Sequence, residues 1–238
     1  MTTARTSFAT ASGGGGPWRG ECVSLVHGFL ANRMMLSLLA LRFRRHGYHT
    51  AIWGYRNMCC SIMVHARRYA EELRRLDRVP DHDRLHLVTH SMGCIIARAA
   101  LTIYRPAKLG RFVMLAPPNR GSVVATAAEG MFGRLFQPVA ELTTAEESFV
   151  NSLPSPQDVA IGVIAAGYDA LIAPHATRPD VPHDHVTVPC LHSSLLYRRD
   201  AAELAAAFLA NGLFPTSATH RGDLCGGLAA ERRSEVAG

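Results

Sequence analysis

The ten residues Leu85–Cys94 read Leu-His-Leu-Val-Thr-His-Ser-Met-Gly-Cys, and they decide the fold. The segment opens with a short apolar run, which is typical of a buried strand. Apolar residues at helical spacing then run from Met92 to Tyr104. The pattern predicts a strand, a tight turn at Ser91 and a helix. A serine in a turn of this kind is presented at the edge of a sheet, which makes it a candidate nucleophile.

Two interpretations of Ser91 stay open. In the first, Ser91 is the nucleophile of a Gly-x-Ser-x-Gly turn, whose strained backbone needs small residues on both sides. Gly93 satisfies that need, and Thr89 stands where the pattern has its first glycine. In the second, Ser91 is an ordinary turn residue that caps the following helix. The position between a predicted strand and a predicted helix favours the nucleophile.

Strands and helices alternate on both sides of this segment. We predict helices over 34–45, 62–76, 92–104 and 201–209, and strands over 22–26, 49–53, 85–88, 111–116, 159–165 and 185–188. Such alternation with short connections implies an α/β fold, a mostly parallel sheet of about six strands with helices on both faces. In sheets of this kind, the chemistry lies beyond the carboxyl ends of the strands.

One folded domain is expected over residues 20–215. Residues 1–19 and 216–238 are rich in small and polar residues without periodicity, so we predict a flexible arm at each end. Residues 120–157 form either a small cap over the site or a helical connection that covers one face of the sheet. As a cap, this segment would supply either a membrane-facing lid or an apolar acyl pocket, built with Phe29 from Met131, Phe132 and Phe136.

A serine hydroxyl is a weak nucleophile at neutral pH, so it needs a general base. Five of the 12 histidines lie far enough beyond Ser91 in the chain, namely His175, His183, His185, His192 and His220. His192 follows the last predicted strand, where a rigid base faces the carboxyl edge of the sheet. His183 and His185 lie at the start of that strand, and His220 lies in the C-terminal arm. We therefore predict that His192 is the base.

The base needs an acid partner that holds its imidazole in one tautomer. Asp169 follows the fifth predicted strand, again at a carboxyl end, and we predict that it is this acid. Asp184 is the rival, but it lies only eight residues before His192, with a strand between them. The alternative for Asp169 is a turn aspartate that bonds its own backbone.

An oxyanion hole requires two backbone N–H groups that point at one position. Met92 follows Ser91 directly and is predicted to supply one of them. The loop after the first predicted strand is expected to supply the other, from Phe29 or, as the alternate, from Leu30.

The residues around these donors are the predicted substrate contacts. We expect such contacts from His27, Gly28, Leu30 and His90. Gly28 would also allow the backbone to turn closely past its neighbours. The alternative for His27 and Gly28 is a simple turn that ends the strand.

Composition excludes several other classes of function. The formal net charge is +6, but Lys108 is the only lysine and the chain has no dense basic run, so we expect no nucleic-acid partner. No apolar run reaches the roughly 18–20 residues of a membrane span. The N-terminus lacks the apolar stretch of a signal peptide, which predicts a cytoplasmic protein. The sequence predicts no particular oligomeric state.

Metal chemistry is the competing interpretation of the C-terminal histidines. His183, Asp184, His185, Cys190 and His192 could contribute ligands to a zinc site. The six cysteines show no metal-type spacing, however, and most are expected to be small core residues. A serine nucleophile needs no metal and accounts for His192 better, so we expect neither a metal nor an organic cofactor.

Taken together, these motifs resemble those of the α/β-hydrolase-fold lipases and esterases. They are most similar to small bacterial lipase-like proteins related to the GPI inositol-deacylase group. The similar stretches occur in the right order over about residues 21–214, and they read VSLVHGF, LHLVTHSMGCIIAR, FVMLAPPNRGS, GVIAAGYD and HVTVPCLH. The resemblance implies a nucleophile at Ser91, an acid at Asp169 and a base at His192, with oxyanion donors at Phe29 and Met92.

The resemblance also implies an activity and a size. The implied activity is the hydrolysis of a small-molecule or lipid carboxylic ester through an acyl-enzyme, with an acyltransferase or a non-catalytic binding protein as the rivals. The chain departs from the family at Thr89, in its short N-terminal part and in its small cap. The family usually begins with two more antiparallel strands, so a minimal version with about six strands is expected.

Overall fold

The computed structural model describes residues 20–56, 60–121 and 149–216 of the 238-residue chain. The two predicted arms lie outside these ranges, apart from Thr216, the first residue of the C-terminal arm. Most of the predicted cap also lies outside, including Met131, Phe132 and Phe136.

Six parallel strands form one sheet, in the order β2-β1-β3-β4-β5-β6. The strands are β1 (Glu21–Val26), β2 (His49–Trp53), β3 (Arg84–His90), β4 (Leu109–Leu115), β5 (Ile161–Ala166) and β6 (Asp184–Val188). This sheet confirms the expected α/β fold, and every strand boundary lies within two residues of its predicted position. Because all pairs are parallel, all six carboxyl ends lie along one edge.

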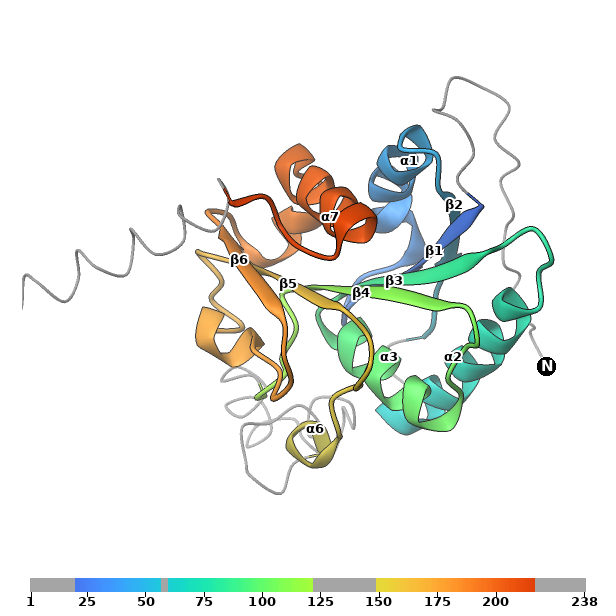
Figure 1. Cartoon of the computed structure of the whole chain (residues 1–238). Coiled ribbons are helices and arrows are strands. Elements are labelled where there is room, and N and C mark those ends of the chain that lie inside the picture. Colours follow the sequence, from blue (N-terminus) through green and yellow to red (C-terminus); the bar gives the residue numbers. More distant parts are fainter. Residues whose placement is uncertain (1–19, 57–59, 122–148, 217–238) are drawn as a thin grey trace, which may run out of the picture.

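Helices cover both faces of the sheet (Figure 1). On one face lie α1 (Ser37–Arg45) and α7 (Arg199–Asn211), and on the other lie α2 (Ile62–Asp77) and α3 (Met92–Ile103). The shorter turns are the 3-10 helices η1 (Arg33–Leu36), η2 (Pro174–Thr177) and η3 (His192–Leu196) and the helix α6 (Phe149–Ser152). Within the described ranges, no helix is long and apolar enough to cross a membrane.

The helix predicted over 34–45 differs from the structure at its start. The chain first makes the 3-10 turn η1, and α1 begins only at Ser37. The side chain of Asn32 accepts a hydrogen bond from the N–H of Met34 at 2.9 Å, which caps the 3-10 turn instead of an α-helix. Over the four residues of η1 the periods of a 3-10 helix and an α-helix, about 3.0 and 3.6 residues per turn, differ too little for the sequence pattern to separate them.

The core has two layers, one on each side of the sheet. In β1, Val23 and Leu25 pack toward α1 and α7, whereas Val26 packs toward α2 and α3. Because both faces are covered, strand residues of either parity are apolar, which is why the strands read as continuous apolar runs. The described thiols of Cys22, Cys94 and Cys190 are free and buried, as expected for core cysteines.

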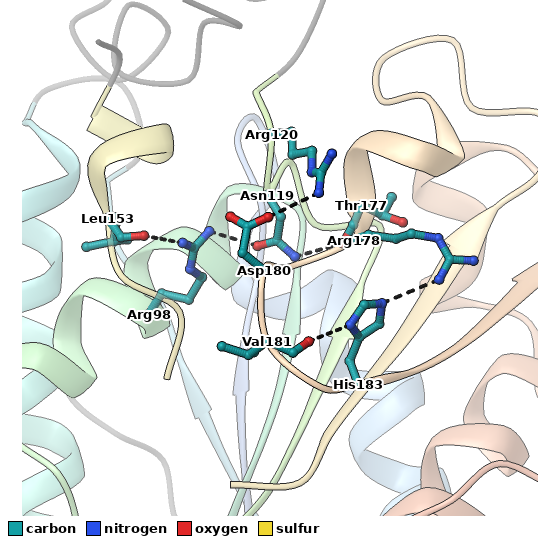
Figure 2. Close-up of polar contacts among 9 residues, drawn as sticks. All are labelled: Arg98, Asn119, Arg120, Leu153, Thr177, Arg178, Asp180, Val181 and His183. Carbon is teal, nitrogen blue, oxygen red and sulfur yellow. Dashed lines mark hydrogen bonds and ion pairs between the residues drawn. The ribbon is translucent and has the colours of Figure 1, made fainter. Parts of the chain in front are cut away.

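A buried arginine joins α3 to three other segments (Figure 2). The guanidinium of Arg98 donates to the side-chain oxygen of Asn119 at 2.9 Å and to the carbonyl of Leu153. The amide nitrogen of Asn119 donates in turn to the carbonyl of Thr177 at 2.7 Å. Burial lowers the pKa of Arg98 to about 10, so it stays charged at neutral pH. The cluster fixes the loop after β4, the end of α6 and the end of η2 against α3.

Replacing Asn119 by alanine is expected to lower the free energy of unfolding by about 2–4 kcal/mol, because it removes the acceptor of a buried charged donor. Urea unfolding measures this change. Arg120→Ala is the matched control, since Arg120 is the next residue and its ion pair with Asp180 is exposed to solvent. The control should change the free energy of unfolding by less than about 0.5 kcal/mol. Equal effects of the two substitutions would contradict the assignment.

Candidate active site

Ser91 lies in a strained turn between β3 and α3. Its backbone has φ 54° and ψ −128°, a left-handed conformation that residues other than glycine rarely adopt. The N–H of Ser91 donates to the carbonyl of Leu115 in β4 at 2.9 Å, and its carbonyl accepts from the N–H of Cys94 at 2.8 Å. These contacts hold the turn, and Ser91 is half-buried at the carboxyl edge of the sheet.

Close packing around Ser91 explains the two glycines of the site. A methyl group at Gly93 would lie 2.5 Å from the carbonyl oxygen of His27. A methyl group at Gly28 would lie 2.7 Å from Cβ of Ser91, so the loop after β1 passes directly against the serine. Thr89, which replaces the first glycine of the motif, fits with its side chain buried, although its hydroxyl makes no hydrogen bond among the described residues.

The two predicted oxyanion donors flank this turn. Met92 is the first residue of α3, where a backbone N–H has no partner within the helix. Phe29 follows Gly28 in the loop that touches Ser91. In the part of the chain that the structure describes, no hydrogen bond engages the N–H of either residue. Leu30, the alternate donor, has a left-handed φ of 55° and is 71% exposed.

His192 and Asp169 are joined by a hydrogen bond of 2.6 Å between Nδ1 of the imidazole and Oδ2 of the carboxylate. Backbone hydrogen bonds continue past the ends of β5 and β6, from the N–H of Gly167 to Val188 and from that of Tyr168 to Cys190. These bonds set the two loops side by side. The Asp169 side chain is fully buried, and that of His192 is 10% exposed.

The other oxygen of Asp169 bonds its own loop. Oδ1 accepts from the N–H groups of Leu171 at 2.8 Å and Ile172 at 3.0 Å. Asp169 is therefore both a turn aspartate that bonds its own backbone and the partner of His192. The two interpretations of this residue do not exclude each other. Burial opposes ionisation of Asp169, but the hydrogen bond and charge of His192 and these two N–H groups outweigh it and lower the pKa of the carboxyl group.

His90 links the serine turn to His192. It precedes Ser91, and its ring lies 4.8 Å from the ring of His192, while its Nε2–H donates to the carbonyl of His192 at 3.4 Å. Within the described residues, the Ser91 hydroxyl has no hydrogen bond to His192. Hydrogen bonds between a nucleophile and its base are often long without substrate and tighten in the reacting complex.

His27 and His90, two of the predicted substrate contacts, are almost fully buried, with 1% and 2% of their surface exposed. His27 donates from Nδ1 to the carbonyl of Gly28 at 2.9 Å, and His90 packs against His192. Both rings lie underneath the turn and the loop and support them.

Two residues beneath the site were not singled out in the sequence. The ring of Tyr55 stacks on His27 at 4.4 Å and contacts His65 at 4.6 Å. His65 is fully buried in α2, and neither of its ring nitrogens has a hydrogen-bond partner within residues 20–56, 60–121 and 149–216. No periodicity or motif marks either contact, because each joins side chains from separate elements.

The rival acid and the zinc alternative involve groups that are engaged elsewhere. Asp184 accepts from the N–H of Phe214 at 2.6 Å at the amino end of β6, opposite to the end that precedes His192. His183 bonds the carbonyl of Val181, and His185 bonds the hydroxyl of Thr177. Over residues 20–56, 60–121 and 149–216, no group of three or more His, Cys, Asp or Glu residues could hold a metal ion.

Solved structures of lipases and related enzymes resemble the chain in fold. The mature form of Bacillus licheniformis lipase BlEst2 matches with a TM-score of 0.65 and 15% identity, over 83% of this chain and 94% of that one. Aspergillus fumigatus lipase B matches with a TM-score of 0.67 and 14% identity, over 87% and 56% of the two chains. Phospholipase PlaB from Legionella pneumophila matches with a TM-score of 0.61 and 16% identity, over 85% and 63%.

These matches show the α/β-hydrolase fold, as the motifs led us to expect. The chain spans 48% of the length of the propeptide form of BlEst2 and 56% of the Aspergillus lipase. No protein-family model matches the sequence. No curated protein matches it by sequence either.

The buried histidines predict a loss of stability in acid. Burial lowers the pKa of His65 to about 4 and that of His90 to about 3, whereas a histidine in the unfolded chain titrates near 6.5. Below about pH 6.5 the unfolded chain therefore binds protons that the folded chain does not. The free energy of unfolding should fall as the pH drops toward 4, by up to about 1.4 kcal/mol per pH unit for each histidine.

Urea unfolding of the wild type and His65→Leu at pH 7.5, 6 and 5 measures this effect. The variant lacks one of the histidines whose pKa is lowered by burial, so its free energy of unfolding should fall less steeply with pH than that of the wild type. Parallel pH curves for the two proteins would contradict the prediction for His65.

Proposed function

We propose that the protein is a serine hydrolase that cleaves carboxylic esters through an acyl-enzyme. The observation that carries the proposal is the 2.6 Å hydrogen bond between His192 and Asp169, at the same sheet edge as a serine in a left-handed turn. A base oriented by a buried carboxylate, at the same sheet edge as a half-buried serine between a strand and a helix, is the arrangement expected for nucleophilic catalysis. The fold shared with lipases and esterases supports the same reaction class.

Acylation begins when Ser91 Oγ attacks the ester carbonyl carbon and His192 Nε2 takes the hydroxyl proton. The carbonyl oxygen becomes an oxyanion, which accepts hydrogen bonds from the N–H groups of Phe29 and Met92. The bond to the alkoxide then breaks, and His192 returns its proton to the leaving alcohol. Asp169 stabilises the imidazolium that exists between these two proton transfers.

Deacylation repeats the cycle with water. His192 removes a proton from the water as its oxygen attacks the acyl carbon, the bond to Ser91 Oγ breaks, and the serine recovers the proton. An alcohol in place of water would give acyl transfer by the same steps. Analysis of the products formed with an alcohol acceptor present therefore separates the hydrolase from an acyltransferase.

Exposed apolar side chains around the site favour esters with an apolar acyl group. Leu30 follows β1, Tyr168 follows β5 and Leu191 follows β6, and their exposures are 71%, 67% and 63%. All three therefore lie on loops at the carboxyl edge of the sheet. The substrate class we propose is a small-molecule or lipid carboxylic ester, and the chemistry uses no metal and no organic cofactor.

Labelling with a fluorophosphonate probe tests for the activated serine. The wild type should label, and Ser91→Ala and His192→Ala should not. Their hydrolysis of a p-nitrophenyl ester should fall by about 10⁴-fold or more. Ser193→Ala is the matched control, because Ser193 is exposed and adjacent to His192, and it should label like the wild type.

The nearby thiol of Cys94 does not complicate this test. Burial raises its pKa to about 12, and the thiol donates to the carbonyl of Thr89, so it is protonated at neutral pH. Folded wild-type protein that neither labels nor hydrolyses esters would favour a non-catalytic binding protein. Undiminished labelling of Ser91→Ala would place the nucleophile elsewhere.

Gly28→Ala tests the contact between the loop after β1 and the serine. The added methyl group would lie 2.7 Å from Cβ of Ser91, so the loop must move and carry the N–H of Phe29 with it. We expect kcat/KM for ester hydrolysis to fall by about 10²-fold or more.

Gly167→Ala is the control, because a methyl group there meets its nearest neighbours at an ordinary distance of 3.4 Å. Gly167 lies in the loop after β5, next to the proposed machinery but not in it. A Gly28→Ala enzyme as active as the Gly167→Ala enzyme would argue against an oxyanion hole in the loop after β1.

A further inference from the structure

Two consecutive peptide groups lead from β1 to the proposed oxyanion donor. They are the peptide between His27 and Gly28 and the peptide between Gly28 and Phe29. A trans peptide is planar, so its C=O and N–H point in opposite directions. Whatever fixes the direction of the Gly28 carbonyl therefore also fixes the direction in which the N–H of Phe29 points.

The imidazole of His27 holds that carbonyl. Its Nδ1 lies 2.9 Å from the carbonyl oxygen of Gly28, and its Nε2 lies 3.4 Å from the backbone nitrogen of Tyr55. The N–H of Tyr55 can only donate and the carbonyl can only accept, so the proton of the neutral ring is assigned to Nδ1. Burial lowers the pKa of His27, which favours this neutral form.

Tyr55 in turn holds His27 in three ways. Its ring stacks on the imidazole with the centroids 4.4 Å apart and the planes 3° from parallel. Its hydroxyl donates to the carbonyl of His27 at 2.9 Å, and its N–H donates to Nε2. The carbonyls of both peptide groups, those of His27 and Gly28, are thus tied to the His27–Tyr55 pair.

We infer that His27 and Tyr55 are positioning residues, which aim the N–H of Phe29 at the oxyanion. The inference rests on the proposed ester hydrolysis and deepens it. Neither side chain touches the substrate. A donor of this kind stabilises the transition state only if it already points at the developing charge, because rotation of the peptide during the reaction would cost the energy that the hydrogen bond supplies.

His65 provides a matched control from the same cluster. It is another buried histidine that contacts Tyr55, at 4.6 Å between ring centroids. Among the described residues neither of its ring nitrogens has a hydrogen-bond partner, so it holds no peptide group of the loop from His27 to Leu30. Loss of the His65 ring disturbs the packing under the loop without removing any hydrogen bond that aims a donor.

The experiment compares the kinetics of ester hydrolysis in five full-length proteins, the wild type, His27→Leu, His27→Asn, Tyr55→Phe and His65→Leu. His27→Leu should lower kcat by about 10²-fold with little change in KM, because the donor acts in the transition state. His27→Asn should recover most of that loss, since its amide nitrogen can occupy the place of Nδ1. Tyr55→Phe keeps the ring and should lower kcat by up to about tenfold.

His65→Leu should keep kcat within about threefold of the wild type, a change smaller than the loss of one hydrogen bond. Equal kcat values for His27→Leu and His65→Leu, or a loss in His27→Asn as large as in His27→Leu, would overturn the inference. Thermal unfolding confirms that each variant is folded. If His27→Leu does not fold, the kcat values of His27→Asn and Tyr55→Phe test the positioning role in its place. A change in KM alone for Tyr55→Phe counts against that role.

These outcomes are distinct from a failure of the proposed function. If the wild type shows no ester hydrolysis that depends on Ser91, the proposed function fails and the inference falls with it. If the wild type hydrolyses esters through Ser91 and His27→Leu matches His65→Leu, the proposed function stands and only the positioning role is lost.

Discussion

Ser91 holds a left-handed backbone between the last residue of β3 and the first residue of α3, and the arrangement of the site depends on it. Such a conformation costs about 1–3 kcal/mol in a residue other than glycine, so the surrounding structure must maintain it. The hydrogen bond from its N–H to Leu115 ties the turn to β4, and Gly93 lets α3 approach the end of β1. Ser91 is half-buried at the sheet edge, while the residues on both sides of it are buried.

The parallel sheet brings the other groups to the same edge. β1, β3, β5 and β6 all end there, and the loop that follows each of them carries one part of the proposed machinery. Asp169 follows β5 and His192 follows β6, and because these strands are neighbours, their loops pair and place the carboxylate against the imidazole. The loop after β1 lies beside the serine because β1 pairs directly with β3.

Much of this arrangement could be predicted from the sequence, because the signals are local. Burial on both faces turns parallel strands into apolar runs, so the positions of the six strands along the chain and their parallel direction followed from their alternation with helices. The turn at Ser91 was marked by Gly93, and Asp169 and His192 were chosen because they follow strands. Their catalytic roles are a proposal, to which the structure adds the hydrogen bond between them.

Contacts between side chains that are distant in the sequence had no such local signal. Tyr55 reaches His27 across 28 positions and Arg98 reaches Leu153 across 55, and no periodicity in the sequence marks these pairs.

The central claim is that the acyl group of the substrate passes through Ser91. The most direct measurement mixes the wild-type protein with a p-nitrophenyl ester, quenches the reaction in acid during the first turnover, and maps the acyl group by peptide mass spectrometry. The account predicts an added acyl mass on the peptide that contains Ser91, formed together with a burst of p-nitrophenol. An acyl group on another residue, or continued turnover without any acylated peptide, would contradict it.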